Sequence, residues 1–336
     1  MKRSKHVLLS QLTLVSIFLV VLAGGVVRMT GSGMGCPDWP KCFDCYIPPT
    51  SIKQLPSNYK DIYAAKREKK IKRFAGFLTA LGFEDKAVEL VEDKSLLIEQ
   101  DFNAFNTWTE YINRLMGALA GLFVLAQVII ATWNIKRSKF IAMLAWALFI
   151  TTMFQAWFGA MVVATNIVPW VLTIHMLLAI VMIINQLHII KLYKINSGEF
   201  KVESDSKIFY VSIFGSLLMI GQTVLGTQVR QEIDEVKNVL PREDWLSTMS
   251  DVFNNHQIMA ILLLAVGGYL VARNIQSGIH SKTIFILGLV ILLEAIVGKL
   301  FSLTGMAGIL QPTHLLLSMI LFSLIYYTFM STKRSQ

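Results

Sequence analysis

Eight long hydrophobic stretches run through the chain, and polar segments, most of them short, separate each stretch from the next. The stretches lie at about residues 7–27, 112–133, 140–163, 170–191, 208–229, 255–274, 283–301 and 309–330. Each is long enough for an α-helix to cross the hydrocarbon core of a bilayer, which is about 30 Å thick. The pattern therefore predicts an all-α polytopic membrane protein with eight transmembrane helices.

The first hydrophobic stretch follows a short basic head, and it would also fit a signal peptide that is removed. Its end, Gly24–Arg28 (GGVVR), recurs in part as Gly226–Arg230 (GTQVR) at the end of the fifth stretch. Because of this recurrence, we interpret the first stretch as a transmembrane helix that is retained.

Landmarks in the first four stretches recur in the last four. The segment Gln155–Gly159 (QAWFG) corresponds to Glu294–Gly298 (EAIVG), and a histidine, His175 or His314, follows each glycine by 16 residues. Each half has an even number of spans, so two such repeats would be related by an axis along the membrane normal. The spacing predicts two pseudo-symmetric four-helix bundles.

A second pair of segments supports the same alignment of the halves. Asn113–Met116 (NRLM) lines up with His256–Met259 (HQIM), and the halves differ mainly in a long loop after the first span. We therefore expect an N-terminal half at residues 1–192, with a long outer loop at 29–110, and a C-terminal half at residues 193–336.

The composition agrees with this class, since 54% of the residues are hydrophobic, 16% are charged and the mean hydropathy is +0.56. A net charge of +9 would suggest a nucleic-acid partner for a soluble protein. Here the basic residues of alternate short loops explain the charge, so no nucleic-acid partner is expected. These residues are Lys136, Arg137, Lys139, Lys191, Lys194, Lys201, Lys207, Arg273, Lys282, Lys333 and Arg334. Their distribution predicts that both termini are cytoplasmic.

The long loop also contains a basic run, at residues 66–73, on the side assigned to the outside. Long loops follow the charge rule poorly, so the short loops decide the orientation. The hydrophobic pattern of residues 74–97 predicts an amphipathic helix that lies on the membrane surface.

Three histidines open even-numbered spans: His175 the fourth, His256 the sixth and His314 the eighth. The matching position at the start of the second span is Asn113. A single histidine in an apolar helix is usually a core residue, but neutral imidazoles that face each other within a bundle can hold a haem iron. We expect His256 and His314 to form such a pair toward the outer face of the membrane.

For His6, His188 and His280, which lie in or near the predicted cytoplasmic ends, ordinary interfacial roles are expected. Small residues one turn inward of the outer positions predict room for a flat macrocycle, although helix packing is the alternative explanation. They are Ala260 in the second half and Gly117, Ala118 and Gly121 in the first.

The second span begins with an acid, an amide and a base on one helical face: Glu110, Asn113 and Arg114. An interfacial polar collar with a snorkelling arginine is the plain interpretation. By register with the second half, however, this face adjoins a haem site that has one histidine, where Glu110 could transfer protons. The outer arginines Arg28, Arg114 and Arg230 could pair with haem propionates or simply snorkel at the interface.

Three cysteines, Cys36, Cys42 and Cys45, lie within one ten-residue stretch of the long loop. Without a nearby histidine they leave a zinc site one ligand short, so a single disulfide in an oxidising compartment is expected instead. Cys36 and Cys42 can close a small ring, which leaves Cys45 either free or competing as a partner.

Several of these segments resemble the sequence signature of the haem A synthases. They are Gly24–Gly33 (GGVVRMTGSG), Glu110–Arg114 (EYINR), Gln155–Gly159, Leu225–Gly226 with Arg230, and the three outer histidines. The resemblance covers all eight spans and leaves out only the middle of the long loop.

The resemblance implies an oxidoreductase of haem biosynthesis in a bacterial inner membrane. Such enzymes oxidise a ring methyl of haem O to the formyl group of haem A, the cofactor of terminal cytochrome oxidases. By resemblance, His256 and His314 bind haem b, His175 binds the substrate haem O, and Glu110 is the essential acid, flanked by Asn113 and Arg114. The expected partners are a membrane electron acceptor such as a quinone, haem O synthase and cytochrome oxidase assembly factors.

The resemblance also implies a disulfide between Cys36 and Cys42. One departure concerns Asn113, because the family usually has histidine at that position. The substrate iron is therefore expected to be held either by His175 alone or by His175 with another group in place of the missing histidine. Two other functions remain open: an electron-transfer cytochrome b, and a protein that delivers haem without chemistry.

Overall fold

The computed structural model describes residues 4–136, 138–164, 169–236, 239–241, 244–304 and 308–334. The short loops predicted at about 164–169 and 302–308, and the basic residue Arg137, lie wholly or partly outside these residues.

Within the described residues, eight helices are long and apolar enough to cross a membrane, which confirms the predicted all-α polytopic membrane protein. They are α1 (Lys5–Met29), α4 (Ala104–Trp133), α5 (Lys139–Ala164), α6 (Pro169–Asn196), α7 (Ser206–Val236), α8 (Asp251–Gln276), α9 (Lys282–Leu303) and α10 (Leu310–Met330). The second of these helices begins about eight residues before the predicted span, since the side chain of Asn103 accepts a hydrogen bond from the Asn106 N–H and caps it.

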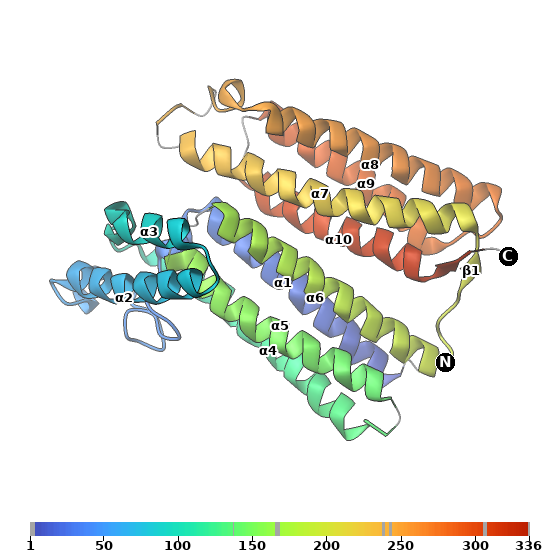
Figure 1. The fold of residues 1–336 in the computed structure, drawn as a ribbon, viewed down its shortest axis with the longest axis horizontal. Helices are drawn as coiled ribbons and strands as arrows, with labels where there is room; N and C mark the ends of the chain where they lie inside the picture. Colours follow the sequence, from blue (N-terminus) through green and yellow to red (C-terminus); the bar gives the residue numbers. More distant parts are fainter. Residues whose placement is uncertain are drawn as a thin grey trace.

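The eight long helices form two groups of four that lie side by side (Figure 1). In the first group α1 contacts α4 and α6, and α5 contacts α4 and α6. In the second, α7 contacts α8 and α10, and α9 contacts α8 and α10. The groups meet where α10 contacts α1 and α6, and where α6 contacts α7. The predicted pseudo-symmetry and the boundary between residues 192 and 193 stay predictions.

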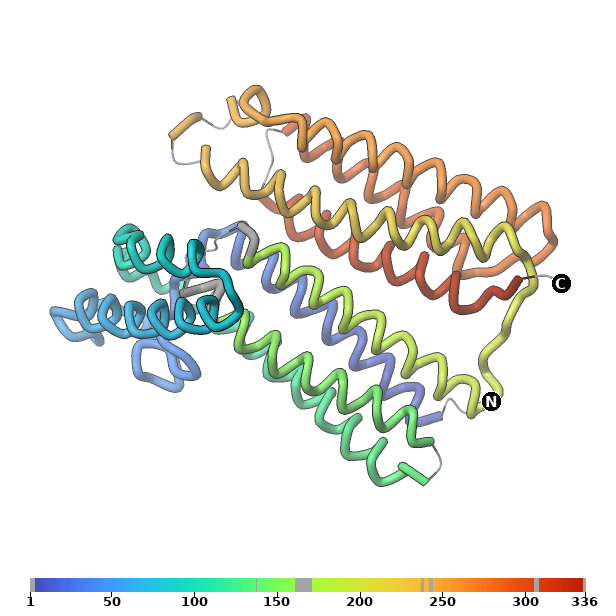
Figure 2. The backbone as a smooth tube through the Cα atoms, viewed as in Figure 1, coloured from blue at the N-terminus to red at the C-terminus, as the bar shows by residue number. Residues whose placement is uncertain are grey.

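Short elements complete the fold: α2 (Tyr59–Ala80), α3 (Glu84–Glu92), the 3₁₀ turns η1 (Ser32–Met34), η2 (Ile52–Gln54), η3 (Lys94–Leu97) and η5 (Leu246–Thr248), and the strands β1 (Glu203–Ser204) and β2 (Thr332–Lys333). The chain passes from the first group to the second through the segment that holds β1, near both termini (Figure 2). There β1 pairs in parallel with β2, and Arg273 Nε donates to Asp205 Oδ2 at 2.9 Å. The opposite end of the molecule carries α2 and α3 (Figure 1). We call it the loop end.

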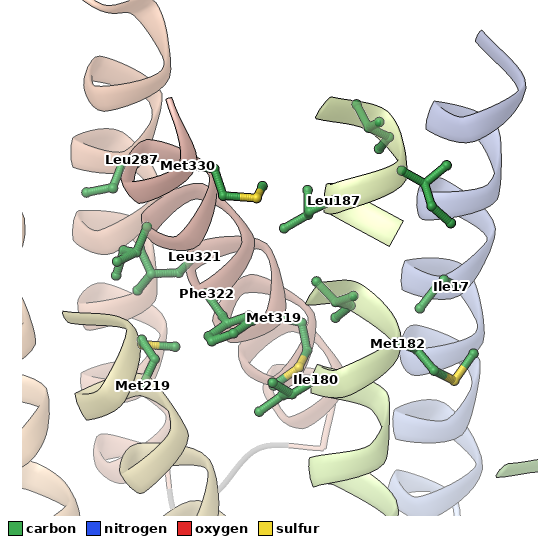
Figure 3. Close-up of a cluster of buried hydrophobic side chains, with 14 of the residues drawn as sticks. Ile17, Ile180, Met182, Leu187, Met219, Leu287, Met319, Leu321, Phe322 and Met330 are labelled. Atoms are coloured by element: carbon green, nitrogen blue, oxygen red, sulfur yellow. The ribbon is translucent and has the colours of Figure 1, made fainter. Parts of the chain in front are cut away.

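A buried apolar cluster joins the two groups of helices (Figure 3). Met319 and Phe322 of α10 are fully buried in it, together with Met219 of α7 and Ile183 of α6. Because the same side chains pack against helices of both groups, their burial stabilises the contact between the groups.

The amphipathic helix predicted at residues 74–97 differs from the structure. The helix α2 begins at Tyr59 and includes the basic run, and α3 follows it. Phe74 of α2 and Leu90 of α3 are buried in one cluster with Phe158 of α5 and Val171 of α6. The protein itself covers part of this apolar face, while Leu81, Phe83 and Val88 stay exposed, so the predicted placement on the membrane surface stays a prediction. Hydrophobic periodicity shows that a face is buried but not what covers it.

One arginine of the basic run is part of the protein interior. Arg67 is 2% exposed, and its guanidinium pairs with Glu99 at 2.9 Å and donates to the Leu96 carbonyl oxygen at 3.1 Å. Burial lowers the pKa of Arg67, and the charge of Glu99 partly offsets that effect. This pair holds α2 against the segment that leads into α4.

Candidate functional site

The three histidines predicted at the outer face, and Asn113, all lie in the N-terminal parts of their helices, at the loop end. His175 lies in α6, His256 in α8, His314 in α10 and Asn113 in α4. The structure therefore brings the four positions to the same end of the molecule, the arrangement that a set of haem ligands at one membrane face requires.

Each of the three histidine rings lies against a glycine of the preceding helix. The pairs are Gly159 with His175, Gly226 with His256 and Gly298 with His314, and a Cβ built on the glycine would lie 3.4, 3.3 and 3.2 Å from the ring atom Cε1. A side chain larger than hydrogen would press on the imidazole, so glycine permits the close approach of helix and ring.

A polar residue lies one turn before each of these glycines. Gln155 Nε2 donates to the His175 carbonyl oxygen at 2.9 Å, Gln222 Nε2 lies 3.2 Å from the His256 carbonyl oxygen, and Glu294 Oε1 lies 3.1 Å from His314 Nδ1. The amides hold a backbone carbonyl, whereas the carboxylate reaches the imidazole itself. The repeated arrangement positions each histidine from the neighbouring helix.

A cavity of about 530 Å³ lies among the helices of the second group and is also lined by residues of α1 and α6; its lining is mostly apolar. His256 and His314 both line it, with ring centroids 6.3 Å apart and ring planes at 70°. Ala260 lines the cavity as well, as expected from its small size.

The two imidazoles fit one haem iron. Imidazole nitrogen binds a first-row metal at about 2 Å, so two rings on opposite sides of one iron have centroids roughly 6 Å apart. The Nδ1 atom of each ring is buried without a completed hydrogen bond, and His256 Nε2 lies 3.3 Å from Gln222 Nε2. Phe301 stacks on His314 with centroids 6.3 Å apart, which fixes the ring from the side.

The first group of helices has one imidazole at the matching place. The His175 ring stacks on Phe158 with centroids 6.3 Å apart, and its Nδ1 is buried without a hydrogen-bond partner. The Asn113 Oδ1 atom is likewise buried and unpartnered. A Cβ built at Gly117 or Gly121 would meet no atom within 4 Å, so α4 leaves space inward of Asn113.

Glu110 is 2% exposed and lies where α4 meets the disulfide loop. One carboxylate oxygen, Oε2, accepts the Cys36 N–H at 2.8 Å, and the other pairs with the guanidinium of Arg114 one turn later. The predicted polar face is thus a buried ion pair that also binds the loop backbone.

Arg114 holds the disulfide loop at three carbonyl oxygens. Its guanidinium donates to the carbonyls of Cys36 at 2.6 Å and Lys41 at 3.1 Å, and also to that of Asp38. The Asp38 carboxylate in turn accepts the Phe43 N–H at 2.7 Å, which closes the turn. The loop is therefore attached to the same two side chains that were expected to act in catalysis.

The cysteine pairing has the form that the resemblance implied. Cys36 and Cys42 form a disulfide and are fully buried, while Cys45 is free and exposed.

Lys70 of α2 donates to the Pro37 carbonyl oxygen at 3.3 Å. Burial lowers the pKa of Lys70, and the charges of Arg114 and Arg67 lower it further. Glu110 accordingly lies in a region rich in positive charge.

Arg28 and Arg230 meet at an acidic residue that sequence reasoning missed. Asp234 of α7 pairs with Arg28 of α1, and its Oδ1 accepts from Arg230 at 2.9 Å. Both arginines line the cavity, and the Nε atom of each is buried without a partner. The spacing of four residues between Arg230 and Asp234 was the available signal.

Two of the three remaining histidines make ordinary side-chain contacts. His188 Nε2 lies 3.0 Å from the Tyr326 hydroxyl, and His6 stacks on Tyr193 with centroids 5.4 Å apart. Neither lies in the cavity lined by His256 and His314.

The chain matches the cytochrome oxidase assembly protein family (COX15-CtaA) over residues 8–78 and 84–326. It is similar to the haem A synthase of Shewanella oneidensis, with 24% identity over 221 residues, which cover 65% of this chain and 54% of that protein. The chain thus matches about half the length of that relative. It is also similar to the haem A synthase of Bartonella tribocorum, with 23% identity over 328 residues, 86% of this chain and 83% of that protein.

The family match runs from the first transmembrane helix to the last and includes His175, His256, His314 and the disulfide loop. With eight membrane-type helices among its described residues, and with His175, His256 and His314 at the loop end, the chain belongs to the cytochrome oxidase assembly protein family.

Proposed function

We propose that this protein is a haem A synthase that oxidises a ring methyl of haem O to the formyl group of haem A. The observation that carries the proposal is the pair His256 and His314, 6.3 Å apart on the wall of one cavity, in a chain of this family. The names of the two curated relatives support the same activity.

In this proposal His256 and His314 hold haem b in the second group of helices. Bound there, haem b supplies a one-electron store inside the membrane. Arg28 and Arg230 each offer an unpartnered Nε–H at the cavity, which suits the carboxylates of haem propionates. Asp234 keeps the two guanidinium groups together and limits their mutual repulsion.

The substrate haem O is held by His175 on one side, since Asn113 is a poor ligand for iron. Removal of a hydride from a ring methyl would build positive charge on the macrocycle, which a nearby carboxylate stabilises. Glu110 supplies that carboxylate and accepts a proton, while Arg114 and the Cys36 N–H keep it oriented. The disulfide loop and α2 cover the site and restrict access of water.

Haem b, held by His256 and His314, would offer the electrons a route to a membrane acceptor such as a quinone. We infer that both termini are cytoplasmic and that the loop end faces the outside of a bacterial inner membrane, where a disulfide is stable. Haem O synthase and cytochrome oxidase assembly factors are the expected protein partners.

The proposal is tested by haem extraction from cells that lack haem A and make haem O. Production of the wild-type chain should yield haem A, whereas Glu110→Gln should leave haem O unconverted with haem b still bound. Glu84→Gln, at an exposed position of α3, is the matched control and should behave as wild type. Haem A at the wild-type rate in the Glu110→Gln strain would refute the role of Glu110.

Absence of haem A from the wild-type strain, with a haem-loaded protein, would instead refute the synthase proposal. The protein would then fit an electron-transfer cytochrome or a haem-delivery protein.

A further inference from the structure

The three histidine sites of this chain have different polar partners at the same helical position. Gln155 and Gln222 carry an amide, whereas Glu294 carries a carboxylate. The two amides have an N–H to offer, and both approach the backbone carbonyl of their histidine, at 2.9 and 3.2 Å. An ionised carboxylate has no N–H, so Glu294 cannot make that contact.

Glu294 instead approaches the ring. Its Oε1 lies 3.1 Å from His314 Nδ1, and the pair is largely buried, with side chains 13% and 29% exposed. The N–H direction is not aligned with Oε1, so the two atoms are within bonding distance without a completed hydrogen bond.

A carboxylate at this distance has two effects on an imidazole ligand. It selects the tautomer with the proton on Nδ1, which leaves Nε2 for the metal, and it raises the basicity of the ring. A buried carboxylate also places negative charge beside the site, where weak screening strengthens its effect. Both effects favour the oxidised iron over the reduced iron.

We propose that Glu294 is a positioning residue that holds His314 through Nδ1 and lowers the reduction potential of the haem bound between His256 and His314. This inference rests on the proposed haem b site. Gln222, next to His256, does not do the same, because its Nε2 lies 3.3 Å from His256 Nε2 and it carries no charge. The two ligands of one iron are therefore unequal, with His314 the stronger donor.

The test compares Glu294→Gln with wild type in the purified full-length protein, by redox titration and electron paramagnetic resonance of the ferric haem. The substitution keeps the shape of the side chain and removes its charge. We expect the low-spin spectrum of bis-histidine ligation to remain, the midpoint potential to become more positive, and the g values to shift toward those of neutral imidazole ligands. Glu235→Gln, an exposed Glu→Gln change in α7 at the same end of the molecule, should alter neither readout.

Two outcomes separate the inference from the proposal on which it rests. If His256→Ala and His314→Ala leave the low-spin haem spectrum unchanged, the proposed haem b site is wrong. If those variants lose the spectrum but Glu294→Gln keeps the wild-type potential and g values, the site stands and the role of Glu294 is refuted. A changed potential with unchanged g values would also refute the contact with Nδ1, because charge alone explains it.

Discussion

At the scale of single residues, the contact between the disulfide loop and α4 depends on one glycine. A Cβ built at Gly35 would lie 2.5 Å from the Asn106 carbonyl oxygen, which is backbone and cannot rotate away. The next residue, Cys36, donates its N–H to Glu110, and the Thr107 hydroxyl donates to the Gly35 carbonyl oxygen at 2.9 Å. Gly35 thus sets the distance between the loop and the acid.

We expect Gly35→Ala to destabilise the protein by about 1–3 kcal/mol, because the loop must move away from α4. The same movement breaks the Cys36 contact with Glu110, so formation of haem A should fall as well. Thermal unfolding in detergent and haem extraction measure the two effects. Gly76→Ala is the control, since a Cβ there meets no atom within 4 Å and the residue lies in α2. Equal stability of the two variants would contradict the account.

Sequence reasoning singled out the candidate histidines and Glu110, but it missed Asp234 and the local contacts of the site. Register between the halves identified the histidines, and polarity at a membrane boundary identified Glu110, because both signals are visible in one dimension. The bonds from Arg114 to the loop carbonyls were not predictable, because they join residues about 75 positions apart through backbone atoms that have no sequence signature. Glu294 was noticed only as a landmark of the repeat.

At the scale of elements, α2 and α3 form a cover over the first histidine site. Phe74 of α2 packs on Phe158 with centroids 6.4 Å apart, and Phe158 stacks on His175. Eight spans were predictable from hydrophobicity alone, because each helix needs a long apolar run. The position of the cover was not predictable, because its apolar face is short and is equally compatible with contact to a lipid surface.

The pair of Arg67 and Glu99 gives the cover a pH dependence. Burial raises the pKa of Glu99, and the charges of Arg67 and Lys70 offset only part of the rise. A carboxyl with a raised folded-state pKa stabilises the fold below its ordinary pKa, and this contribution is lost as the pH rises through the folded value. Stability of the cover relative to Glu99→Gln should therefore decrease as the pH rises above the ordinary carboxyl range.

The rate of protease cleavage within residues 59–92 measures this effect. At each pH, the rate for Glu99→Gln is divided by the rate for wild type. A ratio that does not change with pH would contradict the raised pKa. Lys60 pairs with the exposed Asp101 at the surface, so Asp101→Asn serves as the control and should leave the ratio flat.

At the scale of the whole molecule, two groups of helices are joined by an apolar interface, and His175, His256 and His314 lie at the loop end. Phe322 of α10 is fully buried in the cluster that connects the groups. We expect Phe322→Ala to destabilise the protein by about 3–5 kcal/mol, through lost apolar contact and the cavity left behind. Thermal unfolding in detergent measures this loss of stability. Phe285→Ala is the control, because the Phe285 side chain is 42% exposed. Similar losses for both variants would argue against this interface.

The exposed thiol of Cys45 tests the orientation of the molecule. A membrane-impermeant maleimide should label the wild-type protein in intact cells, because the loop end is proposed to face outward and the other two cysteines are paired. Cys45→Ser should abolish labelling. Labelling only after the membrane is permeabilised would place the loop end in the cytoplasm and contradict the proposed topology.

The most direct test of the central claim, a paired imidazole site beside a single one, is the low-spin haem spectrum of the purified protein in three variants. The account predicts that His256→Ala and His314→Ala each lose the bis-histidine signal, while His175→Ala keeps it and loses only the formation of haem A. A bis-histidine signal that survives both of the first two substitutions, or disappears with the third, would contradict it.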